Sequence, residues 1–251
     1  MAEFFRDGVR IAFLDEGPRD APVVHCIHGF ASNKSVNWVG PGWVKTLTDA
    51  GYRVIAHDNR GHGDSDKPHD EDNYHATVMA DDAAALLSHL NIEKAHVMGY
   101  SMGARISAFL ALRNPGMVRS LIIGGLGTAM IENLNKWGTI ADALLAPSLD
   151  DVTDERGRMF RAFADQTGSD RIALAACITA SRTLLTPDQV ASIQAPTLIA
   201  VGTKDDIAGP PQPLAAMMKA ATVVDIPGRD HMLAVGDKVF KAAVLPFIAA
   251  N

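Results

Sequence analysis

The sequence alternates short runs of apolar and β-branched residues with longer segments of helical period. Between these runs, residues 77–90 and 104–112 space their apolar side chains three and four positions apart, as one face of a helix requires. This alternation predicts an α/β fold, in which a mostly parallel sheet is flanked by helices on both faces. The runs predicted to be strands are residues 23–28, 53–57, 95–100, 119–123, 197–201 and 222–226.

After residue 126 the regular succession of predicted strands stops, and the residues up to the next apolar run at 197–201 favour helices. We therefore predict a helical cap over residues 127–186, inserted before the last strands. Residues 1–126 and 187–251 then form one discontinuous α/β core. A chain of 251 residues with 47% hydrophobic content has enough apolar material for one sizeable core of this kind.

The motif G-Y-S-M-G at residues 99–103 lies directly after one predicted strand and directly before a predicted helix. A sharp turn between strand and helix presents the Ser101 hydroxyl at the mouth of the sheet, and the flanking glycines let neighbouring backbone pass without a Cβ clash. The helix that follows directs unpaired N–H groups toward the same point, where they suit a developing oxyanion. Ser101 is therefore the predicted nucleophile.

A serine hydroxyl needs a base within hydrogen-bond reach, and the base needs an acid that orients it. The loops after the last two predicted strands contain Asp205 with Asp206, and His231. Nine histidines compete for the role of base, but His231 alone follows the last strand, just ahead of a terminal helix. We predict His231 as the base and Asp205 as the acid, with Asp206 as the alternative acid.

A tetrahedral intermediate also needs donors for its oxyanion. The backbone N–H of Met102, one residue past the predicted nucleophile, is the first candidate. The second is the backbone N–H of Phe30, which follows the turn His28-Gly29 at the end of the first predicted strand.

With these residues assembled, the chain resembles the α/β-hydrolase superfamily, in its serine hydrolase, esterase-like branch. The resemblance implies hydrolysis without a metal or organic cofactor. Members that use an aspartate nucleophile, the epoxide hydrolases and haloalkane dehalogenases, and the dienelactone hydrolases, which use a cysteine, are disfavoured by Ser101. The matching segments are His28-Gly29-Phe30, residues 58–65 (D-x-R-G-x-G-x-S), residues 99–103, Gly202 with Asp205, and His231.

The first functional hypothesis is cleavage of a carboxylic ester, or a related acyl bond, of a small and largely apolar substrate through an acyl-enzyme. One alternative keeps the same triad for carbon–carbon bond hydrolysis of a diketone, or for a cofactor-free perhydrolase or haloperoxidase reaction. Diketone hydrolases usually carry polar cap residues for a second carboxylate, and the candidates here are Arg156, Arg158, Arg161, Arg171 and Arg182; for most of them a solvated basic face is the competing interpretation. Another alternative is a hydrolase-fold ligand receptor with slow turnover. The residues predicted to bind substrate are Phe30, Tyr100, Leu126, Leu144, Leu145, Met159, Phe160 and Phe163; for most of the last six, packing of the cap against the core is the alternative role.

Composition excludes several other classes. The net charge of −6 and the lack of a basic stripe argue against a nucleic-acid partner. Cys26 and Cys177 suggest neither a disulfide framework nor a thiolate metal site. No run is long and apolar enough for a membrane span, and the first ten residues lack the apolar stretch of a signal peptide. We therefore expect a cytoplasmic protein that acts on a small molecule.

Overall fold

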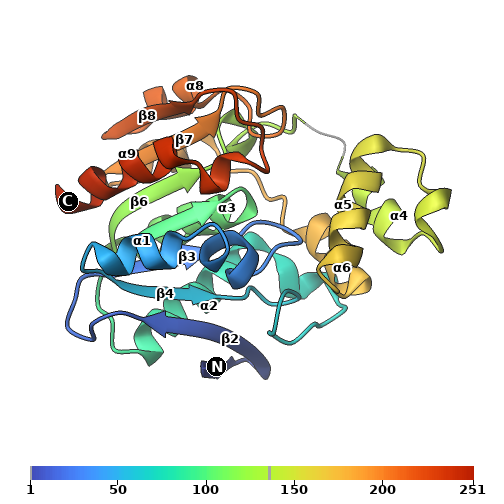
Figure 1. Cartoon of the computed structure of the whole chain (residues 1–251), viewed down its shortest axis with the longest axis horizontal. Helices are drawn as coiled ribbons and strands as arrows, with labels where there is room; N and C mark the ends of the chain where they lie inside the picture. Colours follow the sequence, from blue (N-terminus) through green and yellow to red (C-terminus); the bar gives the residue numbers. More distant parts are fainter. Residues whose placement is uncertain (1, 135–136) are drawn as a thin grey trace.

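The computed structural model describes residues 2–134 and 137–251, and its centre is an eight-stranded sheet in the order β1-β2-β4-β3-β5-β6-β7-β8 (Figure 1). Strands β3 to β8 are parallel, whereas β2 pairs antiparallel with both β1 and β4. The strands are β1 (Ala2–Arg6), β2 (Val9–Glu16), β3 (Val23–Ile27), β4 (Arg53–His57), β5 (Ala95–Tyr100), β6 (Val118–Gly124), β7 (Thr197–Gly202) and β8 (Ala221–Ile226).

The predicted fold class is confirmed, and the six predicted strands correspond to β3 through β8. The hairpin of β1 and β2 was not predicted. Its first strand lies at the edge of the sheet and buries only Phe4, so it has no apolar run. The signal that marks it is the turn between the two strands, where Asp7 and Gly8 both have positive φ, at 51° and 77°. Asp-Gly is a favoured pair for such a two-residue hairpin turn.

Helices cover both faces of the sheet (Figure 1). Successive residues of β5 point to opposite faces of the sheet and pack against the helices there. Met98 packs with α1 and α9 on one face, whereas Val97 packs with α2 and α3 on the other. The helices are α1 (Trp43–Asp49), α2 (Ala76–His89), α3 (Met102–Arg113), α4 (Gly138–Leu145), α5 (Glu155–Gln166), α6 (Arg171–Ala180), α7 (Pro187–Ser192), α8 (Pro211–Met217) and α9 (Lys238–Ala249). None of the helices in the described ranges is long and apolar enough to cross a membrane.

Helices α4, α5 and α6 stand to one side of the sheet, beyond the carboxyl ends of its parallel strands (Figure 1). Helix α4 packs against both α5 and α6, and α6 also contacts the short 3₁₀ turn η2 (Glu71–Tyr74). Leu144 of α4, Phe160 of α5 and Leu174 of α6 belong to the same apolar cluster as the core residues of α3. The helical insert is therefore fixed to the core by continuous apolar packing.

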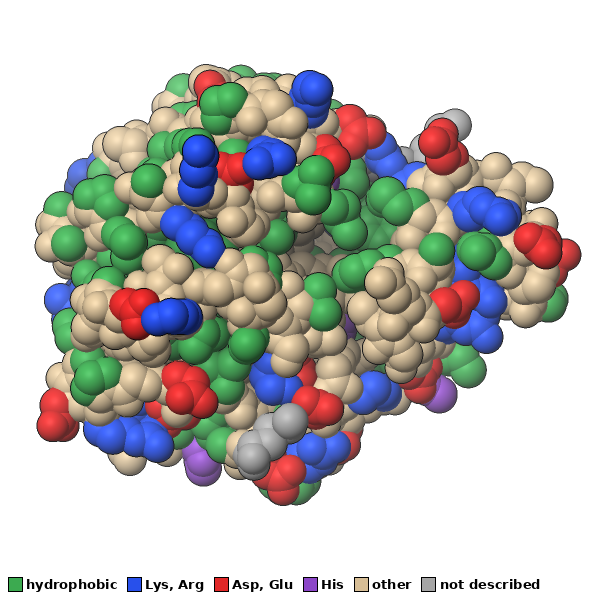
Figure 2. Space-filling view, in the orientation of Figure 1, with side chains coloured by type: hydrophobic (Ala, Val, Ile, Leu, Met, Phe, Trp, Pro, Cys, Tyr) green, Lys and Arg blue, Asp and Glu red, His purple; other side chains and the backbone are tan. Residues whose placement is uncertain are grey.

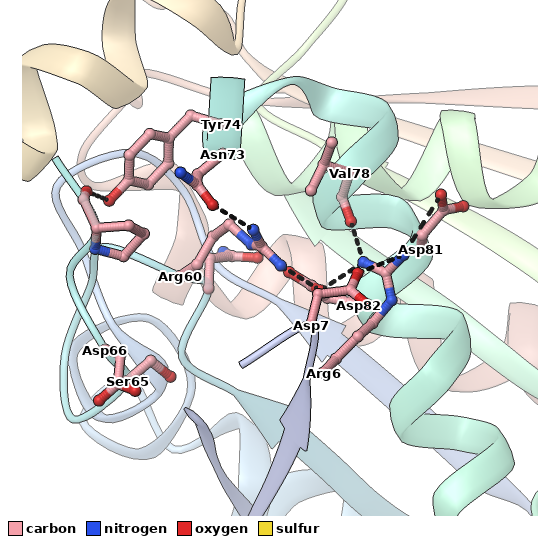
Figure 3. A network of polar contacts seen from close by, with 12 residues as sticks. Arg6, Asp7, Arg60, Ser65, Asp66, Asn73, Tyr74, Val78, Asp81 and Asp82 are labelled. Carbon is pink, nitrogen blue, oxygen red and sulfur yellow. Dashed lines mark hydrogen bonds and ion pairs between the residues drawn. The ribbon is translucent and has the colours of Figure 1, made fainter. Parts of the chain in front are cut away.

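A buried ion-pair network fastens the loop after β4 to the rest of the core (Figure 3). The Nε and Nη2 atoms of Arg60 donate to the two carboxylate oxygens of Asp82 on α2, at 2.7 and 2.8 Å. Arg6 of β1 donates to the same carboxylate at 2.9 Å, and Asn73 accepts from Arg60 at 3.2 Å. On the other side of the loop, the Ser65 hydroxyl donates to the carbonyl of Asp58 and accepts from the Ala12 N–H of β2. The loop is thus held at both ends.

We predict that Asp82→Ala lowers the free energy of unfolding by about 3–5 kcal/mol, because it leaves the Arg60 guanidinium buried without its counter-charge. The neighbouring Asp81 is a matched control: it is 30% exposed and pairs with the half-exposed Arg113 and, at 3.8 Å, with Arg6, whereas Asp82 is 2% exposed. Asp81→Ala is expected to cost about 1 kcal/mol or less. Urea denaturation of the two variants measures both values, and equal losses would contradict the assigned importance of the buried pair.

Candidate active site

Ser101 occupies the sharp turn between β5 and α3. Its φ of 54° and ψ of −113° lie outside the regions that L-residues ordinarily adopt. The turn is held by a hydrogen bond from the Ser101 N–H to the Gly124 carbonyl of β6, at 2.8 Å, and by the Ala104 N–H bonding back to the Ser101 carbonyl at 3.0 Å. These bonds fix the strained residue at the carboxyl edge of the sheet.

Gly99 and Gly103 permit the close approach of backbone that this turn requires. A Cβ atom on Gly103 would overlap the carbonyl oxygen of Ile27 at the end of β3, and one on Gly99 would overlap the carbonyl of Gly103 itself. Helix α3 therefore begins in direct backbone contact with β3, which brings the loop after β3 next to Ser101.

The structure brings Ser101, His231 and Asp205 together although they come from three separate loops. His231 Nδ1 lies 2.8 Å from Asp205 Oδ2, and His231 Nε2 lies 2.9 Å from Ser101 Oγ. Because an ionised carboxylate can only accept hydrogen bonds, Nδ1 carries the proton of the neutral imidazole and Nε2 presents its lone pair to the serine hydroxyl. This arrangement allows proton transfer from Ser101 to His231.

Backbone and side-chain contacts fix the two partners of Ser101. Oδ1 of Asp205, a fully buried side chain, accepts from the N–H groups of Ile207 and Ala208, at 2.9 Å each. Its neighbour Asp206 faces away, is 77% exposed and pairs with Arg156 at 2.9 Å. The Tyr100 hydroxyl donates to the carbonyl of His231 at 2.6 Å. Asp205, and not Asp206, therefore contacts the histidine.

The turn at Gly29 and Phe30 lies against Ser101: a Cβ atom on Gly29 would stand 3.5 Å from that of the serine. The Gly29 N–H donates to Asn37 Oδ1 at 3.0 Å, and its carbonyl accepts from His28 Nδ1 at 2.7 Å. In a trans peptide, this carbonyl and the Phe30 N–H point in opposite directions, so the anchored carbonyl fixes the N–H. The Met102 N–H, in the first turn of α3, has no partner within the helix.

A cluster of buried histidines supports this turn from behind. His28 Nε2 accepts from the Asn59 N–H at 2.9 Å, so His28 Nδ1 carries the proton that bonds to Gly29. Burial, followed by repulsion from His62, lowers the pKa of His28 to about 3, and burial lowers the pKa of His62 to about 4. Burial also holds the pKa values of His25 and His57 below the ordinary value, and the two rings bond to each other at 3.0 Å. These histidines stay neutral at pH 7 and brace the loops.

The serine and histidine open onto a cavity of about 250 Å³ between the core and the α4–α6 helices. Figure 2 shows this hollow, with hydrophobic side chains gathered around it. Of the predicted substrate-binding residues, Phe30, Tyr100, Phe160 and Phe163 line it. Phe160 and Phe163 both come from α5, where their spacing puts them on one face. The complete lining is Gly29, Phe30, Ser32, Val36, Asn37, Pro41, Tyr100, Ser101, Trp137, Phe160, Phe163, Arg182, His231, Met232 and Val235.

Four other predicted substrate-binding residues do not line this cavity. Leu126 and Leu144 are buried in the apolar cluster that joins the core to the α4–α6 helices, so they pack the insert against the core. Leu145 is 56% exposed on the outside of α4, and Met159 faces a second depression beside His231. Helical spacing alone does not separate residues that face a cavity from residues that face a neighbouring helix.

Sequence reasoning missed Trp137 as a cavity residue, and it also missed Asn37, which holds the Gly29 turn. Of the five arginines of the insert that it named for a second carboxylate, Arg182 lines the cavity, and the other four do not. Trp137 and Arg182 lie at the ends of helices α4 and α6, where no apolar period marks them. For Trp137 the only signal available was compositional, an aromatic residue in the predicted insertion. Within the described ranges, no three His, Cys, Asp or Glu side chains gather as metal ligands would.

Comparison with known proteins agrees with this architecture. The family described as alpha/beta hydrolase fold matches residues 22–147, which is half of the chain. The protein therefore belongs to the alpha/beta hydrolase fold family.

Two curated relatives and one solved structure illustrate the likeness. The chain is 36% identical over 117 residues to the AB hydrolase superfamily protein YfhM of Bacillus subtilis, covering 46% of this chain and 40% of that protein. It is 35% identical over 132 residues to the bifunctional esterase/perhydrolase DCH of Acinetobacter calcoaceticus, covering 51% and 45%. These matches thus span less than half of each relative. The structure of a hydrolase from Pseudomonas aeruginosa superimposes with a TM-score of 0.83 at 24% identity, covering 98% and 97% of the chains, which shows a common fold.

The buried histidines predict that the protein loses stability in mild acid. An unfolded histidine takes up a proton near pH 6.5, whereas the pKa values of His28 and His62 in the folded state are about 3 and about 4. As the pH falls below 6.5, the unfolded state alone binds these protons, so the free energy of unfolding falls by up to about 1.4 kcal/mol per pH unit for each histidine.

Urea denaturation at pH 7, 6 and 5 measures this slope. His62→Gln should remove one histidine's share of it, whereas His75→Gln, on the exposed surface, should leave it unchanged. A wild-type stability that is flat between pH 7 and 5 would contradict the prediction.

Proposed function

We propose that the protein is a serine hydrolase that cleaves carboxylic esters of small, largely apolar acyl groups through an acyl-enzyme. The observation that carries this proposal is the continuous chain of hydrogen bonds from Asp205 through His231 to Ser101 at the wall of an apolar cavity. Each of the three side chains has the partner that its role requires. Membership of a hydrolase-fold family agrees with it.

In the proposed reaction, Ser101 Oγ attacks the acyl carbon while its proton passes to His231 Nε2. Asp205 stabilises the imidazolium that forms. The N–H groups of Phe30 and Met102 stabilise the oxyanion; one such donor is typically worth about 3 kcal/mol. Collapse of the intermediate breaks the ester bond, and His231 gives its proton to the leaving alcohol. A water molecule, deprotonated by His231, then releases the acid and restores Ser101.

The shape of the cavity supports an apolar acyl group. Phe30 comes from the core, and Phe160 and Phe163 come from α5, so the acyl pocket is closed by the helical insert. The rings of Phe30 and Phe160 are tilted against each other with centroids 5.6 Å apart. We propose that residues 127–186 act as the cap that selects the substrate.

A second candidate is perhydrolysis, which the name of the Acinetobacter relative favours because it describes both esterase and perhydrolase activity. The same acyl-enzyme would form, and hydrogen peroxide would replace water as the attacking group, so that the acyl group leaves as a peracid. Peracid formation in the presence of peroxide and an ester distinguishes this reaction from simple hydrolysis.

Hydrolysis of p-nitrophenyl esters of increasing acyl length tests the proposal. Wild-type protein is expected to release p-nitrophenol with an optimum in acyl length set by the cavity. Ser101→Ala should lower turnover by about four to six orders of magnitude, because members of a triad act as a unit. A folded Ser101→Ala protein that keeps a tenth of the activity would refute the nucleophile. A folded wild-type protein without any release would favour carbon–carbon bond hydrolysis or ligand sensing.

The two adjacent aspartates provide a matched pair for the role of the acid. Asp205→Asn is expected to lower kcat by about four orders of magnitude, because an amide no longer holds the correct tautomer of His231. Asp206→Asn should change kcat by less than about threefold, since its side chain is exposed and its ion pair is with Arg156 on the insert, away from His231. The opposite ranking would show that the wrong carboxylate has been assigned.

A further inference from the structure

Arg182 is an unusual residue in the wall of the catalytic cavity. Its side chain lines the same cavity as Ser101 and His231, and the guanidinium carbon lies 3.5 Å from the centre of the Trp137 ring. Its Nε atom is buried and has no hydrogen-bond partner in residues 2–134 and 137–251. Among the residues that the structure describes, no carboxylate forms an ion pair with it.

The neighbouring buried arginine, Arg105, differs from Arg182 because its guanidinium donors have hydrogen-bond acceptors. Its guanidinium donates to the carbonyl groups of Ala129, Met130 and Thr183, at 2.6, 3.0 and 2.9 Å. Arg105 therefore uses its donors to hold the two ends of the insert against α3. Arg182 lies close enough to Arg105 for the two charges to repel each other, but within the described part of the chain it has no comparable set of hydrogen-bond acceptors.

The surroundings of Arg182 disfavour an unpaired cation. Burial, followed by repulsion from Arg105, lowers the pKa of the Arg182 guanidinium to about 9, so it still carries its charge at neutral pH. Stacking on Trp137 covers one face of the guanidinium and offsets part of the cost of burial. The N–H groups along its edge are not used by that stacking, and they match the two oxygens of a carboxylate.

We propose that Arg182 binds a carboxylate group of the substrate, so that the enzyme acts on acyl compounds with an apolar chain between the scissile bond and a terminal carboxylate. Half-esters of dicarboxylic acids are the simplest substrates of this class. The inference rests on the proposed function, and it makes that function more specific. A carboxylate is favoured over a phosphate monoester because a single guanidinium balances one negative charge, whereas a phosphate monoester carries nearly two.

Two esters with acyl chains of equal length test the proposal: the p-nitrophenyl half-ester of adipic acid, which ends in a carboxylate, and p-nitrophenyl hexanoate, which ends in a methyl group. Wild-type protein should have the higher kcat/KM for the adipate half-ester. A preference of the wild type for the hexanoate would overturn the proposal without any need for a variant.

Arg182→Gln should lower kcat/KM for the adipate half-ester by about 30- to 100-fold, mainly through a higher KM, because a charge-assisted pair is lost. It should change kcat/KM for the hexanoate by less than about threefold. Arg158→Gln is the matched control, because Arg158 is half-exposed on the same insert and contacts Leu149 and Asp150 outside the cavity. Equal losses on both esters for Arg182→Gln would show that Arg182 only supports the structure.

A binding measurement separates this proposal from the hydrolytic function itself. Calorimetric titration of Ser101→Ala protein with adipate does not depend on turnover. Binding that weakens by about 30-fold or more when Arg182→Gln is added supports the carboxylate site, even if no ester is cleaved. Adipate binding of equal strength in the two proteins, or no binding to either, would overturn it. Failure of Ser101-dependent hydrolysis alone would overturn only the esterase function.

Discussion

The direct contact between the backbone of β3 and the first turn of α3 is the constraint on which the rest of the site depends. Only a glycine at position 103 lets the Ile27 carbonyl approach this closely. That contact sets the Gly29–Phe30 turn beside Ser101, and the hydrogen bond between Ser101 and Gly124 holds the strained serine in place. The nucleophile and the turn that faces it are therefore positioned by rigid strands, and the strain at Ser101 is balanced by the packing of the sheet.

The loops behind this contact are held by buried polar groups whose bonding is local and specific. His28 joins the carbonyl of Gly29 to the N–H of Asn59, and Arg60, next along the same loop, is fixed by Asp82. Burial keeps the imidazole of His28 neutral, so it serves as a fixed bridge between two loops. Rigidity near Ser101 thus derives from polar groups, whereas the helical insert is joined to the core by apolar packing that includes Phe160.

The fold and the candidate triad were predictable because parallel strands carry a strong local signal. Ser101, Asp205 and His231 each follow an apolar strand, and the carboxyl ends of such strands meet at one edge. The distinction between Asp205 and Asp206 depends on side-chain direction, which sequence reasoning could favour but not derive. Trp137 and Arg182 were not predicted as partners, because they lie beyond helix ends in a segment without strands. Their contact is a product of how the insert packs.

The proposed chemistry requires above all that Ser101 is an activated nucleophile. Treatment of the folded protein with a fluorophosphonate, followed by peptide mass spectrometry, tests this claim directly, since such reagents phosphonylate a serine only when a base removes its proton as fluoride leaves. We expect a single adduct on Ser101, formed rapidly by wild-type protein and far more slowly by His231→Ala. An adduct on another serine, or labelling of Ser101 at the same rate without His231, would contradict it.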